Sequence, residues 1–439
     1  IETVRLMGHA GSDVESSYRT PADIVADYAR DPVTCTARLL IDAGVVTPGE
    51  AVSLYEAKRT EVMDAAREVA ELPRLSDAAA VAQPLTDLAD EVAAVESHSD
   101  ATPPGSTLAQ AINVALRQVM TRYPNAVLFG EDVARKGGVY GVTRGLQAEL
   151  GSARVFDTVL DEQSILGLAL GAGVSGLLPI AEIQYLAYLH NAADQIRGEA
   201  ATLQFFSKRQ YRNPMIVRIA GYGYQKGFGG HFHNDNAIAT LRDIPGIVVA
   251  SPSRPEDAAA MLDACAAAAV RHGAVCLFLE PIALYHTRDL YEEGDGQWLS
   301  HSNTAPVRIG EARCYGEGCD LTVVTFGNGV RMSLRVAQKL SEHGIRARVV
   351  DIRWIAPLPV DDILAHAQAT GRVLIVDETR RSGGVSEGIV TALVDARFDG
   401  LVRRVTSEDS FIPLGDAAEH VLLSENTIFD AAIESVRGT

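Results

Sequence analysis

Helical and strand patterns alternate along the middle of the chain, and this alternation restricts the fold more than any other feature of the sequence. Leu108, Ile112, Ala115 and Val119 fall on one face of a helix, and a short apolar run follows at 126–129. Alternation of this kind predicts βαβ units and a parallel sheet. Further strand candidates lie at 155–160, 178–183, 215–220, 247–250 and 275–279. We therefore expect a doubly wound α/β domain over residues 107–290.

The remainder of the chain divides around this domain. A smaller α/β domain is expected at 307–439, with strands at 321–326, 347–352 and 373–377 and a helix at 331–343 that ends at Gly344. Residues 1–84 predict one strand and then helices, because Thr20-Pro21 and Thr47-Pro48 are typical helix starts. The irregular stretches 85–106 and 291–306 are predicted to be linkers.

Charge and composition exclude several classes of function. Acidic residues outnumber basic ones by 57 to 39, and the formal charge of −18 disfavours nucleic acid and anionic lipid as partners. No uncharged apolar run is long enough to span a membrane. The five cysteines are sparse and odd in number, which favours reduced thiols and a cytoplasmic protein. The chain opens at Ile1 in what reads as an interior strand, so we interpret it as a fragment that lacks an upstream part.

Glu162 is a candidate site residue because it stands where a predicted strand ends and a helix begins. Ligands bind at such edges of parallel sheets. A carboxylate in the first turn of a helix also has an ordinary structural role, since it complements the helix dipole. Spacing alone favours the structural role.

Two loops gather polar residues after predicted strands. The glycine-rich loop 221–236 contains His231, His233 and Asp235, a weak pattern for metal ligands and an equally good one for an acid–base histidine. The N-terminal cluster R-x-x-G-H-x-x-S-D-x4-Y-R includes His9, and a hydrogen-bonded surface loop would explain it equally well. Gly294-Asp295-Gly296 imitates a diphosphate motif, but no strand precedes it, and we interpret it as a linker turn.

Taken together, these residues resemble the thiamine-diphosphate-dependent decarboxylating component of 2-oxo acid dehydrogenase complexes. Residues 1–84 resemble the C-terminal part of the α subunit through the cluster around His9, and residues 107–439 resemble a whole β subunit. The motifs are LFGED at 128–132, LDE at 160–162, AEIQ at 181–184, Tyr188 and HNDN at 233–236. The resemblance implies a fused α–β polypeptide with transketolase-like pyrimidine-binding and C-terminal domains.

The resemblance also assigns roles to individual residues. Glu162 would bind the ring nitrogen of the aminopyrimidine of the cofactor, Leu160 and Tyr188 would pack around that ring, and Glu131 would lie near Glu162. His233 and His9 would supply protons for catalysis. No metal ligand is expected in this stretch, because the diphosphate and Mg²⁺ site of the family lies upstream of it. By itself, the stretch is therefore expected to be inactive.

The resemblance implies oxidative decarboxylation of a 2-oxo acid, with acyl transfer to the lipoyl group of a dihydrolipoyl acyltransferase. Tyr188 and the AEIQ motif favour a branched-chain substrate, with pyruvate next. A homodimer is expected. Two alternatives stay open: a non-catalytic fragment that dimerises and binds the acyltransferase, and a transketolase-type sugar enzyme.

Overall fold

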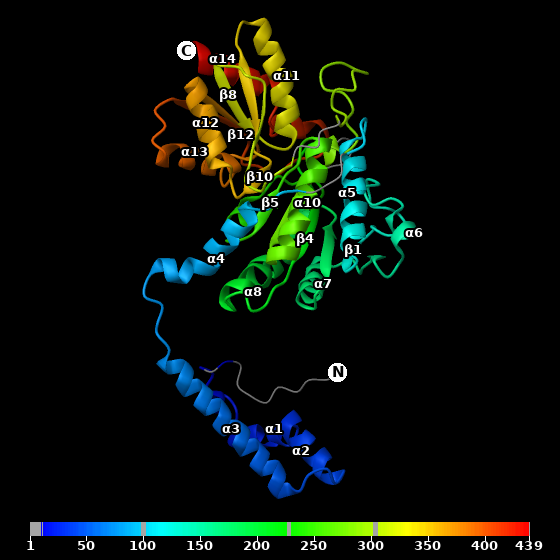
Figure 1. Cartoon of the computed structure of the whole chain (residues 1–439), viewed down its shortest axis with the longest axis vertical. Helices are drawn as coiled ribbons and strands as arrows, with labels where there is room; N and C mark the ends of the chain where they lie inside the picture. Colours follow the sequence, from blue (N-terminus) through cyan, green and yellow to red (C-terminus); the bar gives the residue numbers. More distant parts are fainter. Residues whose placement is uncertain (1–9, 11, 98–101, 226–229, 302–305, 439) are drawn as a thin grey trace. The chain divides into compact units, whose positions relative to one another are not determined.

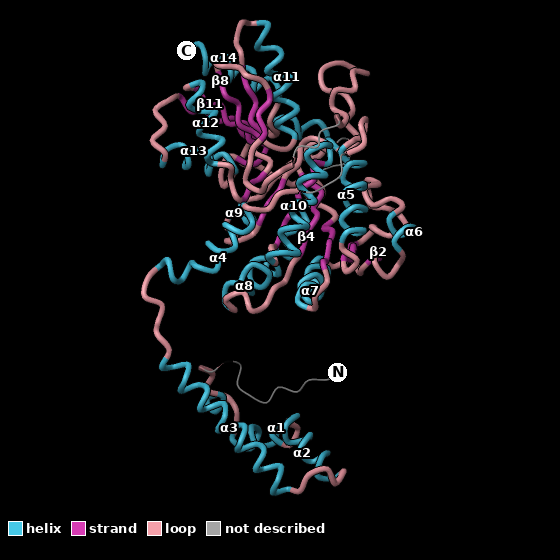
Figure 2. The backbone as a smooth tube through the Cα atoms, viewed as in Figure 1, coloured by secondary structure: helices cyan, strands magenta, loops and turns pink. Residues whose placement is uncertain are grey.

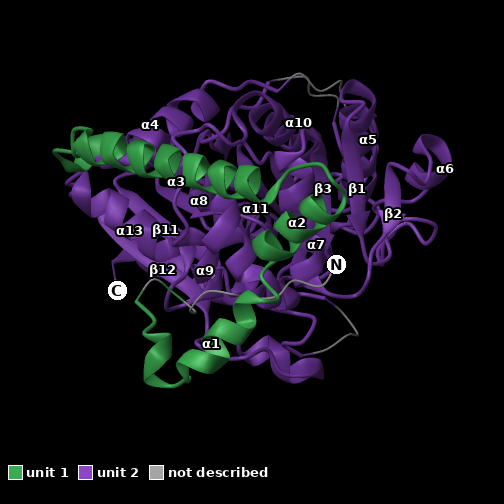
Figure 3. Cartoon of the chain, turned by 90° about the horizontal axis from the view of Figure 1, so that it is seen from below, with its two compact units in different colours: residues 1–80 green, residues 81–439 purple. Residues whose placement is uncertain are grey.

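The computed structural model describes residues 10, 12–97, 102–225, 230–301 and 306–438, and these form two compact units, residues 1–80 and 81–439 (Figure 3). The predicted strand at the start of the chain and His9 lie outside the described residues. No helix within the described ranges is both long and apolar enough to cross a membrane.

Unit 1 is helical, as predicted, and its helix starts follow from local sequence. It contains η1 (Glu15–Ser17), α1 (Pro21–Tyr28), α2 (Pro32–Asp42) and α3 (Pro48–Glu71). Thr47 and Glu50 form a capping box at the start of α3, in which each side chain bonds the backbone N–H of the other. None of the described residues of α1, α2 and α3 is buried. The helices of this unit are thus specified by their caps and not by a core of their own.

Unit 2 contains two sheets that are mostly parallel, which confirms the predicted α/β class (Figures 1 and 2). The larger sheet has the order β10-β5-β6-β4-β3-β1-β2, and only the β10–β5 pair is antiparallel. Its strands are β1 (Ala126–Gly130), β2 (Val155–Asp157), β3 (Leu178–Ile183), β4 (Met215–Gly221), β5 (Val248–Ala250), β6 (Val275–Pro281) and β10 (Trp354–Ala356). Each predicted strand of this region is present, although β2 ends three residues early.

Helices cover both faces of the larger sheet. On one face, α5 (Leu108–Arg122) packs beside α10 (Pro255–His272). On the other, α7 (Glu162–Val174) and η2 (Leu186–Ala192) contribute Ile165, Leu166, Leu186 and Leu189 to the core. Shorter helical elements complete this part of the fold: α6 (Leu146–Leu150), η3 (Gln195–Ala200), α8 (Ala201–Phe206), α9 (Ala239–Arg242) and η4 (Ile282–Leu284).

The smaller sheet has the order β12-β11-β8-β9-β7, with β7 antiparallel to β9. Its strands are β7 (Arg313–Tyr315), β8 (Leu321–Thr325), β9 (Ala347–Asp351), β11 (Arg372–Arg380) and β12 (Leu401–Ser407). Core residues of α11 (Asn328–Glu342) and α14 (Glu425–Arg437) pack on one face, and those of α12 (Val360–Thr370) and α13 (Val385–Asp395) belong to a separate cluster. The element η5 (Gly415–His420) precedes α14.

The first predicted linker, 85–106, is partly wrong. Helix α4 (Ala78–Ala93) continues through Pro84, and Leu88 and Val92 are buried in the core of unit 2. Glu91 accepts two hydrogen bonds from Arg209, at 2.9 and 2.5 Å. The acidic composition of this stretch suggested a solvated connector, but tertiary contacts stabilise a helix that its proline disfavours.

The second predicted linker, 291–306, is also folded where it is described. Trp298 is fully buried, and the Arg254 guanidinium lies 4.6 Å from its ring centroid. The two predicted linkers bond each other, because the Ser106 N–H donates to Ser300 Oγ at 2.8 Å and the Ser300 N–H donates to the Ser106 carbonyl at 2.9 Å. Just beyond the second linker, the Ser97 N–H donates to the Val307 carbonyl at 3.1 Å and the Val307 N–H to Ser97 Oγ at 2.9 Å. Buried backbone groups need partners, and these two irregular segments supply them to one another.

Candidate active site at the carboxyl edge of the larger sheet

Five of the six predicted site residues follow strands of the larger sheet at their carboxyl ends, and one of them, Leu160, is described separately below. Glu131 comes directly after β1, Glu162 follows β2, Tyr188 lies in η2 after β3, and His233 lies in the loop after β4. Parallel strands end at the same edge of the sheet, so the topology brings these residues together.

Glu162 is the first residue of α7, and it is buried although glutamate is an ionisable residue. Only 6% of the residue is exposed, and Asn191 Nδ2 donates to its Oε2 at 3.2 Å. Asp161 caps the helix by accepting the Ser164 N–H at 3.1 Å. The capped N-terminus of α7 favours a carboxylate at this position. The geometry holds the Glu162 carboxyl group in place and leaves its second oxygen for another donor.

Glu131 lies close enough to Glu162 for the two carboxyl groups to interact. Burial raises the pKa of Glu131, and the charges of Glu162, Asp132 and Glu182 raise it further. A carboxylate beside another carboxylate retains its proton more readily, because two like charges in a poorly solvated site repel. The site therefore holds two neighbouring carboxyl groups, the acid pair Glu131 and Glu162, and the pKa of Glu131 lies above its usual range.

Aromatic side chains lie beside His233. The ring centroid of His233 is 5.0 Å from that of Tyr185 and 6.0 Å from that of Tyr188, in edge-to-face arrangements. Tyr140 donates a hydrogen bond to the Tyr185 hydroxyl at 3.2 Å. These rings form a firm, partly apolar surface suited to a flat heteroaromatic ligand.

Leu160 differs from its neighbours because it is 79% exposed, on the turn between β2 and α7. The adjacent Val159 is 68% exposed. The sequence predicted that Leu160 packs around a ligand ring, and the structure leaves it on the surface next to Glu162.

The metal interpretation of the loop after β4 is not supported by the described residues, which contain no group of three or more suitable ligands. Asp235 accepts from Arg380 Nη2 at 3.0 Å and lies 3.3 Å from His190 Nε2. Its carboxylate is thus engaged in ion pairs.

A buried ionic network lies within the larger sheet, and no local sequence pattern predicted it. Arg218 on β4 bonds Glu280 on β6 with two nitrogens, at 2.7 and 2.8 Å, and Glu182 on β3 at 2.6 Å. The Tyr285 hydroxyl donates to Glu280 at 2.6 Å. Sequence reasoning also missed Asn191, His190 and Arg380, because their contacts join elements that are distant in the chain.

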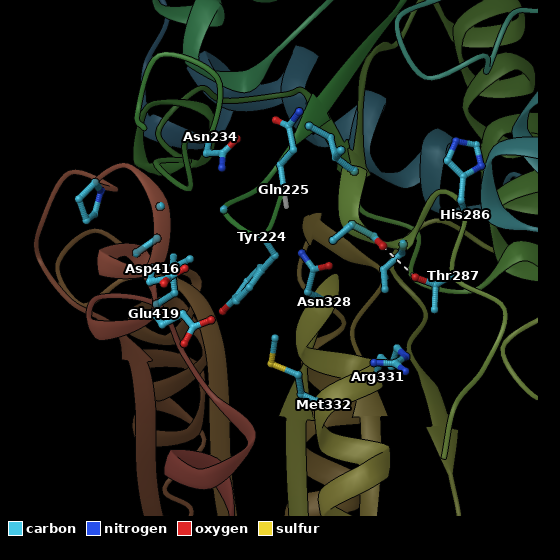
Figure 4. A pocket seen from close by; sticks show the side chains of 18 of the residues that line it. Tyr224, Gln225, Asn234, His286, Thr287, Asn328, Arg331, Met332, Asp416 and Glu419 are labelled. Carbon is cyan, nitrogen blue, oxygen red and sulfur yellow. Dashed lines mark hydrogen bonds between the residues drawn. The ribbon is translucent and has the colours of Figure 1, made fainter. Parts of the chain in front are cut away.

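A separate cavity of about 1120 Å³ lies among η4, α11, η5 and the loop after β4 (Figure 4). Figure 4 shows Asn328, Arg331 and Met332 on one wall and Asp416 and Glu419 on another. Asn234 lines it, but none of the predicted site residues does. The cavity is therefore adjacent to the candidate site and not identical with it.

Comparisons with known proteins agree with this architecture. Residues 1–76 match the family described as Dehydrogenase E1 component, residues 105–286 match Transketolase, pyrimidine binding domain, and residues 310–428 match Transketolase, C-terminal domain. The pyruvate dehydrogenase E1 component subunit beta of Bacillus subtilis (strain 168) is 34% identical over 334 residues, covering 74% of this chain and 97% of that subunit. The chain belongs to the E1 family of 2-oxo acid dehydrogenases.

Other relatives support the same E1 assignment. The corresponding beta subunit of Staphylococcus aureus (strain Mu50) is 34% identical over 338 residues, covering 75% of this chain and 98% of that subunit. A solved chain described as a split gene transketolase, inactive beta4 tetramer, gives a TM-score of 0.60 at 19% identity and covers 75% of this chain. This last likeness concerns the fold and confirms the transketolase-like domains.

E1 enzymes are oxidoreductases, and their transketolase-like domains imply dependence on thiamine diphosphate. The residues present fit the aminopyrimidine half of that cofactor, since Glu162 offers a buried acceptor oxygen beside aromatic rings. The comparisons correct the expected branched-chain type, because these relatives are pyruvate dehydrogenase subunits. A tyrosine and a four-residue motif are too small a part of a pocket to distinguish 2-oxo acids.

Proposed function

We propose that this chain forms the aminopyrimidine-binding part of an E1 active site that oxidatively decarboxylates a 2-oxo acid. Pyruvate is the first substrate to test, because the relatives above are named as subunits of pyruvate dehydrogenase. The observation that carries the proposal is the buried Glu162 carboxyl group at the N-terminus of α7, next to Glu131 and the aromatic side chains. The enzyme is proposed to work in the cytoplasm as a homodimer.

The proposed roles follow from the contacts of each residue. Glu162, held by Asn191, would donate its carboxyl proton to the ring nitrogen of the aminopyrimidine, and Glu131 would lie beside it. Thiamine diphosphate supplies the electron sink for loss of carbon dioxide. Tyr188 packs beside the ring, and Leu160 covers its outer side. The diphosphate and Mg²⁺ site is proposed to lie upstream of this chain, which by itself would then be inactive.

Acyl transfer to the lipoyl group of a dihydrolipoyl acyltransferase completes the proposed reaction. This step needs a proton donor near the reacting sulfur, and His233 lies at the correct edge of the sheet for that role. His9 is proposed to assist it.

Decarboxylation with an artificial electron acceptor tests the proposal in the enzyme that contains this chain. Pyruvate, 2-oxoisovalerate and 2-oxoglutarate should differ in kcat/KM, with pyruvate the best. Glu162→Gln should lower kcat by roughly 100-fold or more, since proton transfer by a positioned group typically contributes that much. The matched control is Glu149→Gln, which changes an exposed carboxylate paired with Arg117.

Two outcomes would contradict the proposal. Turnover of no 2-oxo acid, together with turnover of a ketose phosphate donor, would favour a transketolase-type enzyme. Binding of the acyltransferase without any cofactor-dependent turnover would favour the non-catalytic alternative.

A further inference from the structure

The short helix η2 contacts three separate parts of the candidate site. Leu186, Leu189 and Ala192 anchor it in the core of the larger sheet. Between these anchors, Tyr188 lies against His233, and Asn191 bonds Glu162. The anchored helix therefore ties the positions of the acid pair and of His233 to one rigid element.

His190 adds a third contact from the same helix. Its Nε2 lies 3.3 Å from Asp235 Oδ2, and Asp235 stands two residues after His233. Asp235 also accepts the Ala237 N–H at 3.1 Å within its own loop and Arg380 Nη2 at 3.0 Å. Only 7% of Asp235 is exposed. One buried carboxylate thus joins η2, the loop that carries His233 and the end of β11.

Arg380 is itself fixed in this arrangement. Its Nε donates to the Ser410 carbonyl at 3.1 Å, and its guanidinium lies 5.7 Å from the ring centroid of Phe411. His190, Asp235 and Arg380 form a chain of charged groups. His190, at the other end from Arg380, is less restrained, because its side chain is 49% exposed. Of the three members, His190 is the one that solvent and pH reach most easily.

We propose that His190, acting through Asp235, is a positioning residue that holds the described part of the loop, residues 230–236, so that His233 faces the acid pair. This inference rests on the proposed function and deepens it. In acyl transfer, the carbon left after loss of carbon dioxide would form a bond to one lipoyl sulfur, lose its hydroxyl proton and its bond to the cofactor, and pass two electrons to the disulfide. The S–S bond is reduced and breaks, and the second sulfur takes up a proton. Correct placement of His233 is required for that proton transfer.

The contact between His190 and Asp235 depends on pH, because it is an ion pair only when His190 is protonated. The hydrogen bond to Asp235 raises the pKa of His190, while burial and the charge of Arg380 lower it, and the net shift is upward. Among the described residues, Asp235 and Arg380 are the charged groups that act on His190. The ion pair is therefore lost as pH rises through the raised pKa of His190.

Two reactions of the same enzyme separate positioning from general loss of structure. In His190→Gln, decarboxylation with an artificial acceptor should be unchanged, whereas acyl transfer to a free lipoyl domain should fall roughly tenfold, since small misplacements of reacting groups are costly. Asp235→Asn should act in the same direction. The alkaline limb of the pH profile for acyl transfer should disappear in His190→Gln. The control is His343→Gln, which changes an exposed histidine at the C-terminal cap of α11.

Equal loss of both reactions, or no loss in acyl transfer, would overturn the proposal. Failure of the proposed function is distinguishable, because wild-type enzyme would then decarboxylate no 2-oxo acid at all.

A measurement independent of turnover uses diethyl pyrocarbonate, which modifies neutral imidazole, with peptide mass spectrometry to separate the histidines. The pH midpoint for modification of His190 should fall in Asp235→Asn. In the wild type, the modification rate of His233 should change as pH changes the protonation of His190. In His190→Gln this change should be absent. The positioning role would be refuted if the pH midpoint for modification of His190 is unchanged in Asp235→Asn. It would also be refuted if the modification rate of His233 does not depend on the protonation of His190.

Discussion

At the scale of single residues, two buried charged side chains of unit 2, Glu162 and Arg218, differ in how they are paired. Glu162 is buried with one neutral hydrogen-bond donor, an arrangement that leaves capacity for a ligand. Arg218 is buried with two carboxylates and a tyrosine hydroxyl nearby, so its charge is fully compensated within the protein. Removal of one partner of such a network leaves an uncompensated buried charge.

Arg218→Met is accordingly expected to lower the free energy of unfolding by about 3–5 kcal/mol, because Glu182 and Glu280 would lose their shared partner. Urea denaturation of the purified protein measures this. Arg117→Met, which breaks an exposed pair with Glu149, should cost less than about 1 kcal/mol. Similar costs for the two variants would show that the buried network is not stabilised as its geometry indicates.

At the scale of elements, β11 and α11 meet at a buried carboxyl group. Glu378 on β11 accepts the Asn328 backbone N–H and its side-chain N–H₂, each at 2.7 Å, at the start of α11. Burial raises the pKa of Glu378 to about 8, against the effect of the Asn328 hydrogen bonds. A raised pKa in a folded acid means that the folded state holds a proton that the unfolded chain has released.

Stability should therefore fall as pH rises from about 5 to 8. The wild type should lose about 3 kcal/mol over this range relative to Glu378→Gln, since each unit of pKa difference is worth about 1.4 kcal/mol. The variant keeps a neutral side chain, and Asn328 can turn its amide to accept from it. Chemical denaturation at both pH values measures the effect, with Glu317→Gln as an exposed control. If the free energy of unfolding changes with pH to the same extent in wild type and Glu378→Gln, Glu378 is not the group with the raised pKa.

At the scale of the whole molecule, the two sheets of unit 2 do not form independent cores. Trp354 and Ala356 on β10 follow β9 of the smaller sheet in the chain, yet they pair with β5 of the larger one. One hydrophobic cluster contains Ile219 of β4 and Ile375 of β11 together. Shared burial couples the two sheets energetically.

Unit 2 should thus unfold in a single transition, and Trp354→Ala should destabilise both sheets by about 3–5 kcal/mol, the usual cost of truncating a buried tryptophan. Hydrogen exchange measures this strand by strand: β6 and β8 should lose protection to the same extent. Val394→Ala, at an exposed site on α13, is the control. Loss of protection confined to one sheet would indicate separate folding units.

Local patterns in the sequence were sufficient to predict the helix caps at Thr20 and Thr47, most strands of both sheets and the place of Glu162 at a strand–helix junction. These features depend on residues a few positions apart, and periodicity and capping report them directly. The resemblance of short motifs also led to the prediction that a site lies at the ends of these strands.

Only the tertiary structure decided how α4, β10 and the irregular segments are used. The burial of Leu88 and the pairing of β10 with β5 depend on partners more than 80 residues away, as does the mutual bonding of Ser97 and Val307. The contacts of His190, Asn191 and Arg380 also join separate elements, over 45, 29 and 145 residues of the chain. Sequence periodicity determined what each segment forms, whereas long-range burial and hydrogen bonding determined which segments meet.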